Sequence, residues 1–203
     1  MTGNDQPKVG GLLLAAGGSS RLGRPKQLLQ FDGKTLIRRA AEALANSQCG
    51  PIMVVLGAET ECSSSELSDL PVFISVNKDW QTGMSSSIKT GLNALLALEP
   101  DLEAVVITLC DQPYVTSADI DRLTSEFRNS AAPIVAAKYG EIVGVPALFS
   151  RQLFDDLCRL DGDKGARQLI RDRRSQVQTI KIEKAAIDID RLEDLDRLIS
   201  PQT

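Results

Sequence analysis

Hydrophobic positions along the chain alternate between short apolar runs and longer stretches with helical spacing. The run 9–15 is apolar throughout, whereas residues 35–46 carry apolar side chains every three or four positions. Such runs followed by amphipathic stretches are typical of βαβ units. The same alternation predicts further strands at 51–56, 72–76 and 104–109 and helices at 59–68 and 84–98. We therefore expect a three-layer α/β fold in which helices cover both faces of a mostly parallel central sheet.

The second half of the chain has shorter elements. Ser117 is a suitable N-cap for a helix, and a last strand at 177–182 precedes a terminal helix at 191–199. Short strands near glycine and proline are expected at 134–137, 143–145 and 147–149. We expect one domain over residues 1–203, with a substructure inserted at about 134–176 and disorder at 1–7.

Composition and charge exclude several classes of function. The 27 acidic and 23 basic residues give a net charge of -4 without a dense Lys/Arg run, so nucleic acid is not an expected partner. The four cysteines, Cys49, Cys62, Cys110 and Cys158, form no CxxC pair, and reduced thiols are expected. Histidine is absent, which excludes Ser-His and Cys-His triads and leaves oxygen atoms as the candidate metal ligands.

The sequence also predicts location. The first seven residues lack the basic flank and apolar stretch of a signal peptide, and no apolar run is long enough to span a bilayer. We therefore expect a cytoplasmic protein without a membrane partner.

A glycine-rich segment directly follows the first strand, where open α/β sheets bind ligands. It contains Gly17, Gly18 and Gly23, and it carries Arg21 and Lys26 as full positive charges. Glycines let consecutive backbone amides point into one concavity, which binds phosphate oxygens. The P-loop pattern requires lysine directly after its second glycine, but Gly23 is followed by Arg24. The dinucleotide-binding fingerprint GxGxxG is also absent. A triphosphate site is favoured over the alternative of a glycine-rich turn that binds no ligand.

Several ordered motifs resemble those of MobA-like nucleotidyltransferases, and most of all the molybdenum cofactor cytidylyltransferase branch. The main one is LAAGGSSRLGRPK at 14–26, which continues as QLLQFDGKTL to residue 36. Further motifs lie at 77–88, 110–113, 144–149, 162–167 and 188–190. The similarity covers nearly the whole chain and implies a Rossmann-like nucleotidyltransferase fold.

The resemblance implies which residues bind the nucleotide. They are Ala15, Ala16, Gly17, Gly18, Ser19, Arg21 and Lys26 after the first strand, and Gly83, Ser85, Ser86 and Ser87 at a later helix start. The three serines are equally explained as ordinary helix-start residues. Arg21 and Lys26, together with Asp111, are the expected catalytic residues.

Asp111 is the leading candidate for a metal ligand. It lies just past an apolar strand and beside Pro113, facing the same crevice as the glycine-rich segment, although an aspartate there could also cap a helix. The resemblance implies that it holds Mg²⁺, or alternatively Mn²⁺, between the nucleotide and an acceptor phosphate. The resemblance also implies that the segment 188–190 lies near the metal, where an extended backbone would turn both of its carboxylates to one face and Ile189 to the other. Asp188 is the preferred second ligand, because Asp190 is nearly as well explained as a helix N-cap.

The acceptor side is implied less directly. Gly144, Pro146, Lys164 and Arg167 are the candidate acceptor-binding residues, although solvated surface charge explains the last two equally well. The variant Ala15-Ala16-Gly17 goes with CTP in this family, whereas Ala-Gly-Gly goes with GTP.

The resemblance implies transfer of CMP from CTP to the phosphate of molybdopterin carrying molybdenum. The product would serve a xanthine-dehydrogenase-type enzyme or its maturation chaperone. The alternatives are a cytidylyl- or uridylyltransferase acting on a sugar or polyol phosphate, a guanylyltransferase acting on molybdopterin, and a carrier that binds the cofactor without chemistry.

Overall fold

The computed structural model describes residues 7–18 and 25–189. Several predictions fall on residues outside the described ranges. They concern Ser19, Arg21, Asp190, the terminal helix at 191–199, and the disorder at 1–7, of which only Pro7 is described.

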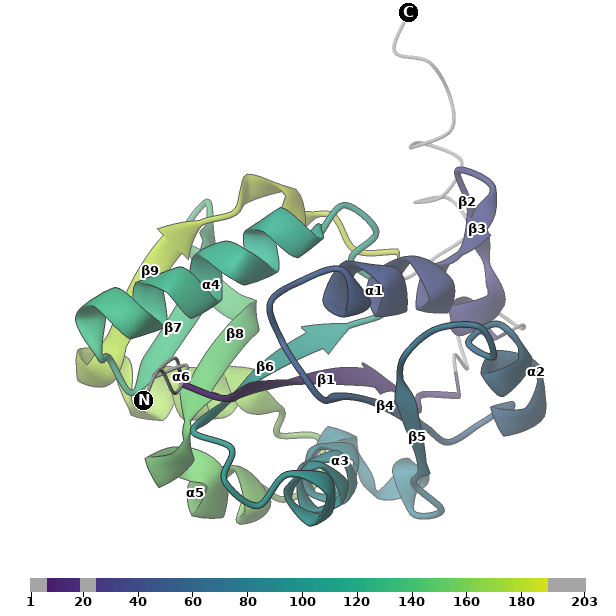
Figure 1. The fold of residues 1–203 in the computed structure, drawn as a ribbon, viewed down its shortest axis with the longest axis horizontal. Coiled ribbons are helices and arrows are strands. Elements are labelled where there is room, and N and C mark those ends of the chain that lie inside the picture. The colour runs from purple at the N-terminus through teal and green to yellow at the C-terminus, as the bar shows by residue number, and fades with distance from the viewer. Residues whose placement is uncertain (1–6, 19–24, 190–203) are drawn as a thin grey trace, which may run out of the picture.

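A seven-stranded sheet forms the centre of the molecule, in the order β5-β4-β1-β6-β8-β7-β9 (Figure 1). Its strands are β1 (Val9–Ala15), β4 (Ile52–Leu56), β5 (Phe73–Val76), β6 (Ala104–Leu109), β7 (Ile134–Tyr139), β8 (Ile142–Ser150) and β9 (Val177–Lys181). β8 runs antiparallel to β6 and β7, and the other neighbouring strands are parallel. The expected mostly parallel α/β sheet is confirmed.

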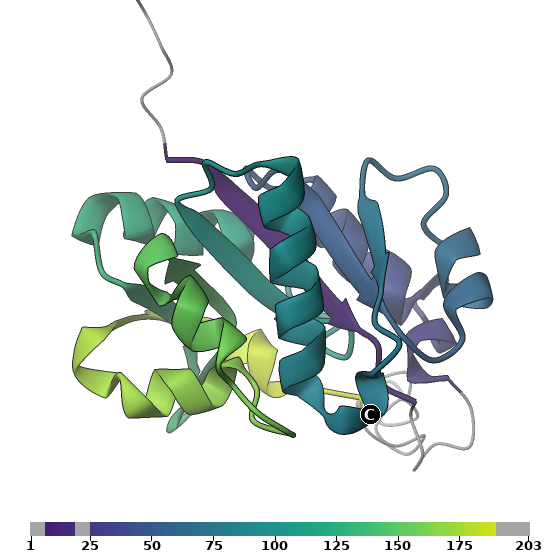
Figure 2. The same cartoon turned by 90° about the horizontal axis from the view of Figure 1, so that it is seen from below.

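Helices cover both faces of this sheet (Figures 1 and 2). α1 (Leu36–Ala45) and α4 (Ser117–Ser130) lie on one face, and α3 (Met84–Leu98), α5 (Phe154–Cys158) and α6 (Ala166–Asp172) lie on the other. Shorter elements are α2 (Thr60–Ser65), the hairpin of β2 (Gln30–Phe31) and β3 (Lys34–Thr35), and the 3-10 turns η1 (Lys26–Leu28), η2 (Trp80–Thr82), η3 (Arg151–Leu153), η4 (Arg174–Gln176) and η5 (Glu183–Ala186). Within the described ranges, no helix combines the length and apolarity that crossing a bilayer requires.

The continuous apolar character of β1 follows from its burial on both faces. Leu12 and Leu14 pack into the cluster beneath α3, whereas Leu13 and Ala15 point to the opposite cluster beneath α1. Since successive side chains of a strand alternate between faces, a strand covered on both sides needs apolar residues at every position. Burying each leucine stabilises the fold by about 1.5–3 kcal/mol.

Three expectations need correction. Thr116, not Ser117, is the N-cap of α4, because its hydroxyl accepts from the Asp119 amide while the Asp119 carboxylate accepts from the Thr116 amide. The strands expected at 143–145 and 147–149 are one strand, β8, whose register against β7 shifts at the position of Pro146. Residues 134–176 do not form an inserted unit, since β7 and β8 continue the central sheet and α5 and α6 pack on it.

We expect Gly91→Ala to destabilise the protein although the change favours helix formation. A Cβ at Gly91, in the middle of α3, would lie 2.3 Å from Cδ1 of Leu12 and 2.6 Å from Cγ2 of Val55. Overpacking of this kind costs about 1–3 kcal/mol, which exceeds the helix-propensity gain of about 0.5–1 kcal/mol. The measurement is the free energy of unfolding in urea.

Asn93→Ala is the matched control in the same helix. Asn93 is exposed, so this variant should keep the wild-type free energy of unfolding or raise it slightly. A Gly91→Ala protein as stable as Asn93→Ala would show that α3 is not in tight contact with β1.

Candidate active site

The strand order places a topological switch point at the ends of β1 and β6. From β1 the chain proceeds outward to β4 and β5 and then returns to β6 on the other side of β1. The connections after β1 and after β6 therefore diverge, and open α/β sheets bind ligands at such a switch point. The first connection leads to Lys26, and Asp111 lies two residues beyond β6.

Lys26 and Asp111 form an ion pair at this switch point. The Lys26 Nζ lies 2.6 Å from Oδ2 of Asp111, and the two side chains are 20% and 15% exposed. The second carboxylate oxygen of Asp111, Oδ1, is buried and has no hydrogen-bond partner among the residues described. A buried carboxylate oxygen without a donor is costly, and a bound cation would satisfy it.

Two buried glutamines, each next in sequence to one of these charged residues, have an anchoring role that the sequence analysis did not predict. The buried Gln27 donates its amide protons to the carbonyl oxygens of Ala15 and Gly17, at 2.9 and 2.5 Å. The buried Gln112 donates to the carbonyl oxygens of Val145 and Ala185, at 3.1 and 2.8 Å. Gln27 thus fixes the start of the glycine-rich segment, and Gln112 ties the Asp111 backbone to β8 and η5. The sequence signals for this role are their direct adjacency to Lys26 and Asp111 and their place in the motifs at 14–36 and 110–113.

The chain returns to Asp111 at the end of the described residues. The backbone N–H of Ile189 donates to the carbonyl oxygen of Asp111 at 3.0 Å. The Ile189 side chain is buried in a small cluster, whereas Asp188 is exposed. The predicted opposite orientation of these two neighbours is confirmed, and the role of Asp188 as a second metal ligand stays a prediction.

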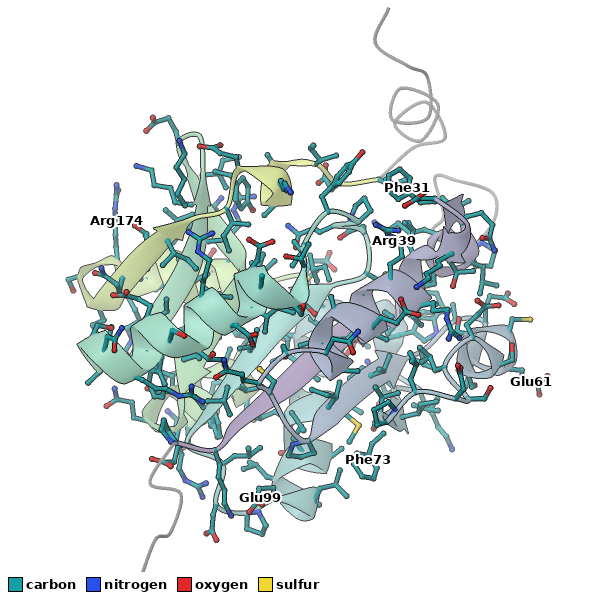
Figure 3. All side chains as sticks on the ribbon, turned by 45° about the horizontal axis from the view of Figure 1, so that its top comes forward. Phe31, Arg39, Glu61, Phe73, Glu99 and Arg174 are labelled. Atoms are coloured by element: carbon teal, nitrogen blue, oxygen red, sulfur yellow. The ribbon has the colours of Figure 1, made fainter. Side chains whose placement is uncertain are left out.

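An aromatic contact network supports this small cluster. Besides Ile189, the cluster contains Leu29, Phe31 and Leu36, with Tyr114 packed against it. The Phe31 and Tyr114 rings meet edge to face with centroids 5.4 Å apart, and the Arg39 guanidinium carbon lies 5.1 Å from the Phe31 centroid. Figure 3 shows Phe31 and Arg39 side by side near the β2–β3 hairpin. The hairpin therefore helps to hold the 188–189 segment against Asp111.

The donor set fits a hard divalent cation that also binds substrate. The described residues contain no group of three or more Asp, Glu, Cys or His side chains arranged for a metal. Mg²⁺ commonly uses one or two protein carboxylates and takes its other ligands from substrate phosphates and water. Asp111, with its unpartnered Oδ1, and Asp188 are suited to this kind of site.

The predicted nucleotide-binding positions differ in what they offer. Gly17 is exposed with open space on its Cβ side, as a ligand approach requires. At Gly18, a Cβ would lie 2.4 Å from Cη2 of Trp80, so this glycine makes room for the indole. Ala15 and Ala16 are buried in the two core clusters, and their side chains therefore cannot contact a base directly.

The serines at the start of α3 have partners within the protein. Ser85 donates its hydroxyl to the Gly162 carbonyl oxygen at 2.8 Å, and Ser86 donates to that of Gly83 at 2.8 Å. The Asn77 amide donates to the hydroxyl oxygens of Ser86 and Ser87, at 2.8 and 3.0 Å. Direct nucleotide contacts by these hydroxyls, and by Gly83, stay predictions.

The predicted acceptor-binding residues fall into two groups. Gly144 and Pro146 are buried in β8, whereas Lys164 and Arg167 are exposed, before and within α6. A Cβ at Gly144 would lie 2.7 Å from the Tyr139 hydroxyl oxygen, so Gly144 makes room for that ring.

Tyr139 is a further residue that the sequence did not indicate. Burial raises the pKa of Tyr139, and the charge of Arg167 opposes this while those of Asp188 and Asp111 add to it. The charges that act on this hydroxyl thus include those of both candidate metal ligands and of a candidate acceptor-binding residue.

Thiol reactivity should report the packing around Asp111. Burial raises the pKa of Cys110 to about 12 and that of Cys49 to about 11, whereas Cys62 is exposed. Since the thiolate is the reactive form, Cys110 and Cys49 should stay protonated and unreactive toward a disulfide reagent at pH 8. We expect Cys62 to react first in the native protein, and the two buried thiols only after unfolding.

A Cys62→Ser variant is the control, because it should remove the fast reaction phase. Rapid modification of Cys110 in that variant would contradict the packing described next to Asp111.

Comparison with known proteins agrees with the motifs. A model of the MobA-like NTP transferase domain matches residues 11–179. The "Nicotine blue oxidoreductase" of Paenarthrobacter nicotinovorans is 32% identical, over 98% of this chain and 100% of its own length. A "Probable molybdenum cofactor guanylyltransferase" of Bacillus cytotoxicus is 27% identical over 67% of either chain.

Solved structures share the fold over nearly the full length. The Rv0371c homolog from Mycobacterium sp. strain JC1 is 33% identical with a TM-score of 0.80, covering 95% of this chain and 96% of its own. A complex of Rv0371c with manganese from Mycobacterium tuberculosis H37Rv is 26% identical with a TM-score of 0.74, covering 96% and 98%. With the family model spanning most of the sequence, this chain belongs to the MobA-like NTP transferase family and is a nucleotidyltransferase.

Proposed function

We propose that this nucleotidyltransferase transfers CMP from CTP to the phosphate of molybdopterin carrying molybdenum, and releases pyrophosphate. The observation that carries the proposal is the Lys26–Asp111 pair, with its buried and unpartnered Oδ1, at the switch point of the sheet. A similar protein named for molybdenum cofactor guanylyl transfer supports the acceptor.

Asp111 and Asp188 are the residues that would hold a divalent cation. Mg²⁺ bound there would neutralise negative charge on the two reacting phosphates and so let them approach. The manganese complex of Rv0371c supports a divalent metal and makes Mn²⁺ an alternative.

The protein's own groups act by charge and position. An oxygen of the acceptor phosphate forms a bond to the α-phosphorus, and the bond from that phosphorus to the bridging oxygen breaks. The electron pair leaves with pyrophosphate. Lys26 supplies positive charge beside Asp111 for the oxygens that gain charge in this step. The acceptor phosphate is ionised at neutral pH and needs no general base, which suits a chain without histidine.

The base is selected indirectly in this proposal. The Ala15-Ala16-Gly17 sequence favours CTP by family resemblance, but the two alanine side chains are buried. Base selection by this segment would therefore act through its backbone groups, which Gln27 holds in place. GTP is the second candidate, because the Bacillus cytotoxicus relative is named a guanylyltransferase.

The proposed substrates indicate which partners and which location we expect for the protein. Both are small molecules, and the product would pass to a molybdoenzyme of the xanthine-dehydrogenase type or to its maturation chaperone in the cytoplasm. Nucleic acid is not an expected partner of a chain with a net charge of -4 and no basic run.

The base and acceptor are tested by pyrophosphate release from CTP, GTP, ATP and UTP with Mg²⁺, with and without molybdenum-loaded molybdopterin. We expect release from CTP only when the loaded cofactor is present. Release from GTP alone would replace the cytidylyl assignment with a guanylyl one. No release from any nucleotide, combined with redox turnover of nicotine blue in a separate assay, would favour the activity named for the Paenarthrobacter relative.

The roles of the two charged residues are tested by Asp111→Asn and Lys26→Ala. Each should lower turnover by about 10²–10³, since each removes charge that stabilises the transition state. Asp111→Asn should also change the dependence of turnover on Mg²⁺ concentration. The free energy of unfolding of both variants should stay high enough that the protein remains folded under the assay conditions, so that unfolding does not account for the loss of turnover.

Lys34→Ala is the matched control. Lys34 pairs with Glu42 on the surface at 2.6 Å and is 47% exposed, so its removal should alter turnover by less than about two-fold. A Lys26→Ala protein that behaves like this control, or that loses activity only because it unfolds, would contradict the proposed role of Lys26.

A further inference from the structure

A clasp joins the start of α3 to a distant loop. We call residues 161–165, which lie between α5 and α6, the acceptor loop, because it contains Lys164 and leads to Arg167. The Gly162 carbonyl oxygen accepts two hydrogen bonds from Ser85, one from the backbone N–H at 3.2 Å and one from the hydroxyl at 2.8 Å. The two residues are 77 positions apart in sequence, and Ser85 is only 6% exposed. In Figure 2 this loop runs toward the lower end of α3, where the helix begins.

The backbones at the clasp are too close for side chains. Gly83 has a φ of +116°, and a Cβ there would lie 2.3 Å from the carbonyl carbon and oxygen of Gly162. On the loop side, a Cβ at Gly165 would lie 2.5 Å from the Met84 sulfur. Both glycines therefore allow the two backbone segments to pack closely, so the contact between the segments involves more than the hydrogen bonds of Ser85.

The clasp is the polar attachment of this loop to the rest of the described protein. The other hydrogen bonds of the loop are local, from the Lys164 N–H to the Asp161 carbonyl and from the Gln168 N–H to the Gly165 carbonyl. α6, which follows, is anchored by apolar packing of Leu169 and Ile170. Loss of the clasp would therefore free the loop and its cation without unfolding α6.

The same segment also touches the glycine-rich segment after β1. Trp80 lies three residues before Gly83, and its ring occupies the space where side chains at Gly18 and Gly57 would lie. Ser86 and Ser87 are held by the Asn77 amide. Residues 80–85 thus contact the predicted triphosphate side and the predicted acceptor side of the site.

We propose that Ser85 is a positioning residue for acceptor recognition: its hydroxyl holds the acceptor loop in place beside the nucleotide side of the site, so that Lys164 and Arg167 can meet an anionic acceptor. Ser85 then acts on the acceptor through the loop rather than as a ligand of the nucleotide. The role in acceptor recognition rests on the proposed function, whereas the position of the loop rests on the clasp alone.

The test combines limited trypsin digestion of the full-length native protein with steady-state kinetics of Ser85→Ala. The variant loses one hydrogen bond to Gly162 and keeps the backbone one, so cleavage after the exposed Lys164 should become about three- to ten-fold faster. The KM for molybdenum-loaded molybdopterin should rise by a similar factor, while the KM for CTP stays within about two-fold. Ser130→Ala removes an exposed hydroxyl that donates to the Glu126 carbonyl in α4 and accepts from the Ala132 N–H just after it, and this variant should leave both readouts unchanged.

Gly165→Ala is a second variant that disturbs the clasp from the loop side, and it should also speed cleavage after Lys164. Unchanged cleavage in both variants would overturn the proposal. So would equal acceleration at tryptic sites throughout the chain, since that reports global unfolding. A rise in the KM for CTP alone would overturn it too and would make Ser85 a nucleotide ligand. If the wild-type protein releases no pyrophosphate, the proposed function fails, but cleavage after Lys164 still decides whether Ser85 holds the loop.

Discussion

The site depends on the pairing of Lys26 and Asp111 across the ends of two adjacent parallel strands. Their 2.6 Å contact is largely shielded from water, and one oxygen of Asp111 is buried without a partner. Partly buried ion pairs contribute little net stability, because desolvation of both charges offsets their attraction. An arrangement that leaves an oxygen unsatisfied is therefore better explained by a ligand that completes it than by the stability of the fold.

The same local design supports both charges. Each is followed in sequence by a buried glutamine, Gln27 after Lys26 and Gln112 after Asp111, whose amide bonds two backbone carbonyls of other segments. In each pair, the charged side chain thus lies at the candidate site, while the glutamine side chain after it is buried and hydrogen-bonded to the backbone. Because catalysis of phosphoryl transfer relies on positioning and charge, fixing the backbone beside each charged residue would contribute directly to the proposed function.

Beyond these pairs, the site is assembled from connections at one end of the sheet. The small cluster around Ile189 brings Asp188 back to Asp111, and the clasp at Ser85 brings the acceptor loop to the start of α3. Since the sheet and its helices form the common scaffold, relatives with different names can differ in these connections while keeping the fold. Substrate choice in this family is therefore expected to lie in the connections and not in the core.

The sequence by itself determined the layered fold and the two main charges. The bounds of β1, α3 and β6 follow from apolar spacing, and Lys26 and Asp111 stand out because each lies in a motif just past a buried strand. The sequence did not reveal that Pro146 lies within one continuous strand, since a proline looks like a break until a register shift accommodates it. Nor did it reveal Gln27, Gln112, Tyr139 or the contact of Ser85 with Gly162. These roles depend on contacts between segments far apart in the chain, and local patterns of polarity do not encode which distant carbonyl, ring or loop a side chain will meet; only the tertiary structure decided them.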